Sequence, residues 1–329
     1  MPIRNKNVLV TGGTGSFGQK FVEIALRDYD PQKIIIFSRD ELKQFEMQQK
    51  FGKDSRMRYF LGDVRDKERL NRAFDDVDIV IHAAALKQIP AAEYNPFEAI
   101  KTNVIGAENV IEAAIDCGVK NVIALSTDKA ANPVNLYGAT KLCSDKLFVA
   151  GNSYVGEQDT SFSVVRYGNV VGSRGSVIPY FLEQRSNGKI PITDIRMTRF
   201  WITLEQGVRF VLDSLHRMSR GEIFVPKLPS MKVADLAMVI APECEQEIVG
   251  IRPGEKLHEV MITEEDARHT FEFRDYYVIV PQFRWWKREN CQNGQALPDG
   301  FIYSSDRNDW WLSEAEIKEI VQDMSLPDY

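Results

Sequence analysis

The 329-residue sequence has few of the side chains that bind metals or form cross-links. Its four cysteines, at positions 117, 143, 244 and 291, lie far apart without a C-x-x-C pair, and its four histidines add no ligand pattern. This spacing differs from that of zinc motifs and of disulfide frameworks. We therefore expect no metal site, and we expect the thiols to be reduced and buried.

Long apolar runs and clusters of basic residues are also missing. No apolar stretch approaches the roughly 20 residues that span a bilayer, and residues 1–6 lead into a strand without the apolar region of a signal peptide. The 41 basic residues are scattered among 47 acidic ones, for a net charge of −6. The sequence therefore predicts a cytoplasmic protein with neither a membrane nor nucleic acid as a partner.

Short β-branched runs alternate with helical patterns along the first two-thirds of the chain. Buried strands are predicted at 7–10, 33–37, 58–61, 78–82, 121–126 and 161–166. Helices are predicted between them at 17–26, 42–51, 67–74, 99–117 and 135–150. This alternation is typical of an α/β protein with a Rossmann, doubly wound parallel sheet.

The pattern changes after Tyr167, where turns rich in Gly, Ser and Arg follow the last strand. A helix at 203–218 and a strand at 221–225 are predicted to return to the sheet. We therefore expect a cofactor-binding Rossmann domain over 1–166, joined by 203–225. Residues 167–329 would mainly form a smaller, interleaved lobe that binds substrate.

A glycine-rich turn follows the first strand and opens the first helix. It places Gly12, Gly15 and Gly18 three residues apart, with Ser16 and Phe17 between the last two. Backbone N–H groups and a helix N-terminus can then approach a diphosphate, where any Cβ would interfere. The turn predicts a nicotinamide dinucleotide as cofactor.

The end of the second strand bears on the choice between NADP and NAD. Arg39 follows Ser38 at the position where NAD-binding proteins usually carry an acid, and this favours a 2′-phosphate and hence NADP. Asp40 follows directly and keeps NAD as the less favoured alternative. The other residues predicted to contact the cofactor are Lys43 after this strand, Asp63 and Val64 after the third, and Ala83, Ala85 and Lys87 after the fourth.

The fifth strand and the helix after it carry candidate catalytic residues. Tyr137 and Lys141 are four residues apart and share a helix face, where a neighbouring ammonium ion favours loss of the phenol proton. Thr127 ends the strand and can hold the same substrate hydroxyl, so the three residues suit oxidation of an alcohol. Asp128 and Lys129 add an acid and an amine that such an oxidation does not need.

With these residues the chain resembles the extended short-chain dehydrogenase/reductases, and among them the UDP-N-acetylglucosamine 4,6-dehydratases that invert C5 and begin pseudaminic acid biosynthesis. The matching motifs are TGGTGSFG at 11–18, FSRDELKQFEM at 37–47, GDVRD at 62–66, HAAALKQIP at 82–90, STDKAANPVNLYGATK at 126–141, RYGNVVGSRGSVIP at 166–179, MTRFWIT at 197–203 and RPGEKLHE at 252–259.

The resemblance implies a role for each catalytic candidate. Tyr137, with Lys141, would take the proton of the C4 hydroxyl while NADP accepts the C4 hydrogen. Lys129 would then remove the C5 proton, for which it needs a lowered pKa, and Asp128 would protonate the leaving C6 hydroxyl. The reverse assignment of Asp128 and Lys129 stays open.

The resemblance also implies the partners of the chain. UDP-N-acetylglucosamine would be the substrate, and the chain would form a homo-oligomer, with a hexamer as one arrangement. The residues expected to contact the substrate are Lys87, Thr127, Asn169, Arg199, Arg252 and Glu255.

Three alternative functions remain. A UDP-hexose 4-epimerase shares the fold, the tyrosine and the cofactor but does not need Asp128 and Lys129. A 4,6-dehydratase that retains C5 is a second alternative, because some retaining relatives also carry the Asp-Lys pair. A non-catalytic dinucleotide-binding sensor is the third, although it would have no need of Tyr137 and Lys141.

Overall fold

The computed structural model describes residues 1–171, 177–287 and 291–322. A ten-stranded sheet in this part of the chain has the order β16-β14-β15-β10-β6-β5-β4-β1-β2-β3. From β10 to β3 all neighbours are parallel, as the Rossmann prediction requires. Their bounds are β1 Asn7–Thr11, β2 Lys33–Ser38, β3 Met57–Leu61, β4 Ile79–His82, β5 Asn121–Thr127, β6 Ser161–Tyr167 and β10 Ile223–Pro226.

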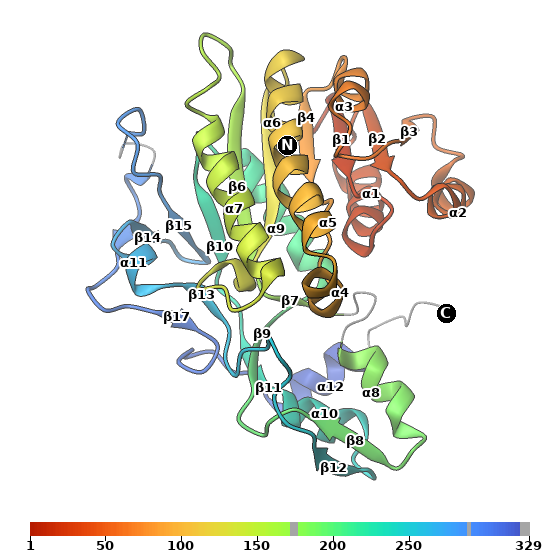
Figure 1. The fold of residues 1–329 in the computed structure, drawn as a ribbon, viewed down its shortest axis with the longest axis vertical. Helices are drawn as coiled ribbons and strands as arrows, with labels where there is room; N and C mark the ends of the chain where they lie inside the picture. Colours follow the sequence, from red (N-terminus) through yellow and green to blue (C-terminus); the bar gives the residue numbers. More distant parts are fainter. Residues whose placement is uncertain (172–176, 288–290, 323–329) are drawn as a thin grey trace.

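The predicted helices connect these strands. The long helix predicted at 99–117 contains a π-helical turn, η1, at Lys101–Ile105. In Figure 1, α6 and α7 run side by side across the sheet, and these two helices pack together. The connecting helices are α1 Ser16–Asp28, α2 Glu41–Phe51, α3 Lys67–Phe74, α4 Ile89–Tyr94, α5 Pro96–Ile100, α6 Gly106–Asp116, α7 Leu136–Gly151 and α9 Leu204–Arg217.

The sheet extends further into the C-terminal third than the sequence predicts. Beyond β10 lie β15 (Tyr276–Ile279), β14 (Thr270–Glu272) and β16 (Gln295–Ala296), which pair antiparallel. Of this part of the chain, the sequence predicts only that 203–225 returns to the sheet. These strands are short and lack the alternation with helices that identified the others.

A second group of elements lies beyond the carboxyl ends of the parallel strands (Figure 1). It has its own apolar core, in which Ile178, Phe181, Trp201, Leu236 and Ile317 are buried. The elements of this group are α8 Val177–Arg185, β8 Lys189–Ile192, β9 Thr198–Ile202, β11 Ser230–Lys232, α10 Val233–Ile240, β12 Glu245–Ile248 and α12 Glu314–Gln322, and β7 Asn169–Val170 pairs with β9. The short elements β13 Val260–Ile262, α11 Glu264–Ala267 and β17 Tyr303–Ser304 instead pack on the core of the large sheet.

Three expectations concern the thiols, a membrane-spanning helix and a metal site. All four cysteines have free thiols, but only Cys291 is buried and Cys143 is exposed on α7, so the prediction of buried thiols is wrong for the others. No helix in the described ranges is long and apolar enough to cross a membrane. Within the same ranges, no three His, Cys, Asp or Glu side chains lie together as a metal site.

Candidate active site

A cavity of about 730 Å³ lies at the carboxyl ends of the parallel strands, between the sheet and the second group of elements. Its walls include residues from every segment that the sequence analysis selected. The predicted residues that line it are Gly12, Gly15, Ser16, Phe17, Ser38, Arg39, Asp40, Lys43, Asp63, Val64, Ala83, Ala85, Lys87, Thr127, Lys129, Tyr137, Lys141, Asn169, Arg252 and Glu255. Gly18, Asp128 and Arg199 are not in the wall.

The glycine-rich turn at one end of the cavity fits a diphosphate. Gly12 has a φ of +65°, and a Cβ there would lie 2.8 Å from the Cα of Ala84. A Cβ on Gly18 would lie 2.1 Å from the carbonyl oxygen of Gly13, so this glycine allows α1 to pack close to the turn. Helix α1 begins at Ser16 without a side-chain cap from Gly15 and without an acid in its first turn. The positive end of its dipole therefore faces the cavity without a competing carboxylate.

Basic side chains gather where β2 ends. Arg39 is exposed, and its Nη1 lies 3.5 Å from Oδ2 of Asp63. Asp40 caps α2 by accepting a 3.0 Å hydrogen bond from the backbone N of Lys43, and its carboxylate contacts Lys43 Nζ at 2.8 Å. Asp40 thus has a structural task, whereas Arg39 and Lys43 present cations at the cavity wall.

Tyr137 and Lys141 lie one turn apart on α7, whose first residues are fixed by Asn135. The side chain of Asn135 accepts a 2.8 Å hydrogen bond from the backbone N of Gly138. Burial raises the pKa of Tyr137 to about 12, and this outweighs the charge of Lys129 and a hydrogen bond with Thr127, which act in the opposite direction. The expected easier loss of the phenol proton is therefore wrong for the free protein. Burial also lowers the pKa of Lys141.

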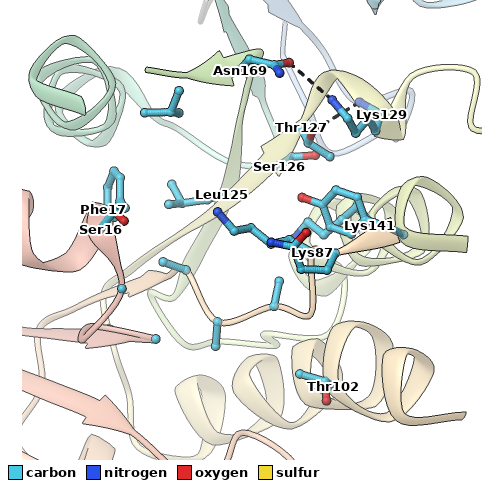
Figure 2. A pocket seen from close by; sticks show the side chains of 18 of the residues that line it. Ser16, Phe17, Lys87, Thr102, Leu125, Ser126, Thr127, Lys129, Lys141 and Asn169 are labelled. Atoms are coloured by element: carbon cyan, nitrogen blue, oxygen red, sulfur yellow. Dashed lines mark hydrogen bonds between the residues drawn. The ribbon is translucent and has the colours of Figure 1, made fainter. Parts of the chain in front are cut away.

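Thr127, Asp128 and Lys129 form a connected group at the end of β5 and the start of η2 (Asp128–Ala130). The Thr127 hydroxyl donates to Oδ1 of Asp128 at 2.9 Å, and Lys129 Nζ donates to the same oxygen at 3.1 Å. Lys129 Nζ also lies 3.5 Å from Oδ1 of Asn169, the contact drawn in Figure 2. The Asp128 side chain is 1% exposed, whereas that of Lys129 is 21% exposed and lines the cavity. Lys129 is therefore the member of the pair that reaches the cavity.

Glu259 is a buried acid that the sequence analysis did not select. Its Oε1 lies 3.2 Å from Lys129 Nζ. Burial alone would lower the pKa of Lys129, but the carboxylates of Asp128 and Glu259 outweigh it and raise this pKa. The lowered lysine pKa that the sequence analysis required is therefore not found. Glu259 ends the RPGEKLHE motif, and that position was the one signal available in the sequence.

Arg199 occupies a different place from the one expected. Its guanidinium donates to the backbone carbonyls of Thr198, Leu257 and Lys256 and lies 3.7 Å from Glu259. Arg199 thus supports the segment that carries Glu259, and the structure does not bring it to the cavity wall. Residues 172–176 of the RYGNVVGSRGSVIP motif lie outside the described residues.

Two polar groups behind the wall hold the catalytic segments in place. Asp145, four residues after Lys141, accepts a 2.7 Å hydrogen bond from Ser126 and contacts Arg166 at 3.3 Å. Asn103, in the π-helical turn, bonds both backbone groups of Leu86. The loop that carries Lys87 is therefore tied to α7 through the hydrogen bond from Asn103 to Thr140.

Figure 2 shows how the two ends of the cavity face each other. Ser16 and Phe17 lie on one side, and Thr127, Lys129 and Lys141 lie on the other. Lys87 lies between the two sides. The arrangement places a site for a dinucleotide within reach of a phenol and an amine, so one bound substrate can meet both.

Comparisons with known proteins agree with this geometry. The model of the polysaccharide biosynthesis protein family matches residues 8–281. The chain belongs to this family. A curated relative is the inverting UDP-N-acetylglucosamine 4,6-dehydratase of Campylobacter jejuni, 59% identical over 96% of this chain and 97% of the relative. The UDP-glucose 4-epimerase of Rickettsia canadensis is 42% identical over 84% of this chain and 83% of the relative.

Solved structures share the fold of this family member. The X-ray structure of Pen from Bacillus thuringiensis superposes with a TM-score of 0.91 at 36% identity and covers 99% of both chains. DesIV from Streptomyces venezuelae, a dTDP-glucose 4,6-dehydratase solved with NAD bound, has a TM-score of 0.69 at 24% identity. It covers 76% of this chain and 86% of its own, and it supports the fold alone.

Proposed function

We propose that the protein is an NADP-dependent dehydratase of UDP-N-acetylglucosamine. It would form a UDP-2-acetamido-2,6-dideoxy-hexos-4-ulose with inversion at C5, the first step of pseudaminic acid biosynthesis. The observation that carries the proposal is that Tyr137 and Lys129 line one cavity that also contains the dinucleotide turn. The 59% identical relative from Campylobacter jejuni bears the name of this activity.

The cofactor would bind at the end of the cavity that contains the glycine-rich turn. Residues 1–166, with 203–225, would hold the cofactor through Gly12, Gly15 and the N-terminus of α1. Arg39 and Lys43 would hold its 2′-phosphate, since Asp40 is already used to cap α2. The bound cofactor would supply the acceptor for the C4 hydrogen and its return to C6. Because the reaction regenerates the oxidised cofactor, the cofactor need not leave the protein between turnovers.

The protein's residues would act in two stages. Tyr137, once it has lost its own proton, accepts the proton of the C4 hydroxyl, with Lys141 beside it and Thr127 holding the same oxygen. The resulting C4 ketone acidifies the C5 hydrogen, so Lys129 can remove it once its amine is neutral. The C6 hydroxyl leaves as water when it receives a proton. As the C4 hydrogen returns to C6, C5 takes up a proton on its opposite face, which inverts this centre and balances the proton that Tyr137 took from the C4 hydroxyl. We propose that the Asp128–Lys129 pair donates the proton to the C6 hydroxyl, and that Lys129 is the member of the pair that reaches the substrate.

Residues 167–329 would mainly bind the nucleotide part of the substrate. Arg252 and Glu255 line the cavity from the second group of elements, and Asn169 lies beside Lys129. A guanidinium at this place suits a diphosphate, and a carboxylate suits ribose hydroxyls. Lys87 projects between the two ends and would contact both cofactor and sugar. We also expect a homo-oligomer.

The test is incubation with UDP-N-acetylglucosamine and NMR of the products. The proposal expects a 4-keto-6-deoxy sugar with inverted C5 and no net change in the cofactor. The 42% identity to a UDP-glucose 4-epimerase supports epimerisation at C4 as the second candidate. Recovery of a C4 epimer that retains its C6 hydroxyl would decide for that function instead.

A further inference from the structure

Lys129 lies between two buried carboxylates that come from distant parts of the chain. Its Nζ is 3.1 Å from Oδ1 of Asp128 and 3.2 Å from Oε1 of Glu259. Asp128 precedes Lys129 directly, whereas Glu259 precedes β13, which packs against η2. The Glu259 side chain is 2% exposed. Its contact with Lys129 is therefore shielded from bulk solvent. Charges interact more strongly in such a buried place than they do in water.

The position of Glu259 is fixed by its own backbone. Its N–H donates to Oγ of Ser305 at 2.9 Å, and the Ser305 N–H donates to its carbonyl oxygen at 2.8 Å. Ser305 is fully buried, and its hydroxyl also contacts that of Thr198 on β9 at 2.7 Å. The carboxylate is thus held at Lys129 by Ser305 and Thr198, neither of which lines the cavity.

The other charged groups around Lys129 make Glu259 an anion. Arg199 approaches Glu259 at 3.7 Å, and Lys256 donates to the carbonyl oxygen of Ala131 at 2.7 Å. Burial alone would raise the pKa of Glu259, but Lys129, Arg199 and Lys256 outweigh it and lower this pKa. The polar groups that remain near Lys129 are Asp128, Thr127, Tyr137 and Asn169.

The two carboxylate oxygens of Glu259 differ, because Oε1 contacts Lys129 and Oε2 does not. Among the residues that the structure describes, its Oε2 has no hydrogen-bond partner, and the same is true of Oδ2 of Asp128. Buried polar atoms without partners cost free energy, so packing alone does not explain an acid here. A glutamine could make the same backbone contacts without the charge.

We propose that Glu259 is a positioning residue that strengthens Lys129 as a base and so sets the pH at which the C5 proton is removed. The inference rests on the proposed function. An ammonium ion beside two anions holds its proton more firmly, and the neutral amine, once formed, accepts the C5 proton more readily. Glu259 would do this without touching the substrate.

The decisive variant is Glu259→Gln, which keeps the shape and removes the charge. Its Lys129 should lose a proton at lower pH, because an anionic neighbour is gone. The rising limb of log kcat against pH should move about 1 to 3 pH units downward. The maximal rate should fall, because a weaker base abstracts the proton more slowly. Glu259→Asp withdraws the carboxylate by one methylene and should give a smaller shift in the same direction.

The matched control is Glu245→Gln on β12, which removes one exposed carboxylate that lies 3.9 Å from Lys189. Its profile should coincide with that of the wild type. A rising limb that stays in place in Glu259→Gln overturns the inference, as does an equal shift in Glu245→Gln. Where Glu259→Gln fails to fold, an unmoved limb in Glu259→Asp overturns it as well.

A direct titration separates this inference from the proposed function. The side-chain signal of Lys129, identified by its loss in Lys129→Arg, can be followed against pH by NMR of lysine-labelled protein. The midpoint should be lower in Glu259→Gln than in the wild type. A wild-type protein that makes no 4-keto-6-deoxy sugar would contradict the proposed function, whereas equal Lys129 midpoints would contradict the role of Glu259.

Discussion

The two ends of the cavity are built in different ways. The diphosphate turn at the cofactor end comes from one stretch of chain, in which β1, the glycine-rich turn and α1 follow one another, and Arg39 and Lys43 follow the next strand, β2. The acid–base end joins the segment 127–141 to Asn169 on β7 and to Glu259 before β13. Local geometry therefore defines the diphosphate turn of the first end, whereas the second end exists only when the chain has folded.

The difference also concerns electrostatics. At the cofactor end, Arg39 and Lys43 are partly exposed and their charges are screened by solvent. At the acid–base end, Asp128 and Glu259 are buried and shift the pKa of Lys129 upward. Substitutions should therefore change cofactor preference modestly at the first end and catalysis strongly at the second.

Tyr137→Phe should have the largest effect, because it removes the proton acceptor for the first stage. We expect kcat to fall about 10³- to 10⁴-fold, with the cofactor still bound and still oxidised. NMR of product formation measures kcat, and the absorbance of the bound nicotinamide reports its oxidation state. Tyr154→Phe, an exposed tyrosine, is the control. Full activity of Tyr137→Phe would show that the phenol has no part in the chemistry.

Lys129→Ala should stop the reaction one stage later. Oxidation at C4 does not need the amine, so the variant should accumulate reduced cofactor while product formation falls about 10²- to 10³-fold. Single-turnover absorbance of the nicotinamide follows the first stage. Lys146→Ala, at an exposed position of α7, should behave as the wild type. Loss of the cofactor from Lys129→Ala would instead indicate a structural role.

The sequence predicted the cofactor end better than the acid–base end for a physical reason. A strand, a glycine turn and a helix form one local unit, and the parallel strands are marked by buried β-branched runs. The contact of Lys129 with Glu259 depends on how β13 packs against η2, which no local pattern encodes. Arg199 was misplaced for the same reason, because nearby carbonyls already use its donors.

Arg39→Ser tests the cofactor end. Loss of one charge-assisted contact to a 2′-phosphate should reduce the preference for NADP over NAD about tenfold to a hundredfold. Binding of both nucleotides by calorimetry gives the ratio. Arg72→Ser on α3 removes an exposed arginine elsewhere and should leave the ratio unchanged. An unchanged ratio in Arg39→Ser would assign the 2′-phosphate to other residues.

Asp40→Ala should have the smallest effect. Loss of the α2 cap should lower the free energy of unfolding by about 1 kcal/mol, and Asp40→Ser should restore most of it. Thermal or urea unfolding of the two variants measures this. The ratio of NADP to NAD binding should not change in either variant. Selective loss of NAD binding in both would mean that Asp40 contacts a ribose instead of serving mainly as a cap.

A single cavity that oxidises C4 and then removes water across C5 and C6 would return the C4 hydrogen to C6. UDP-N-acetylglucosamine labelled with deuterium at C4 tests it most directly, because the label reports where the removed hydrogen returns. We expect the deuterium to appear in the C6 methyl group of the 4-keto product. Deuterium found at C4 of an epimer that keeps its C6 hydroxyl would contradict it.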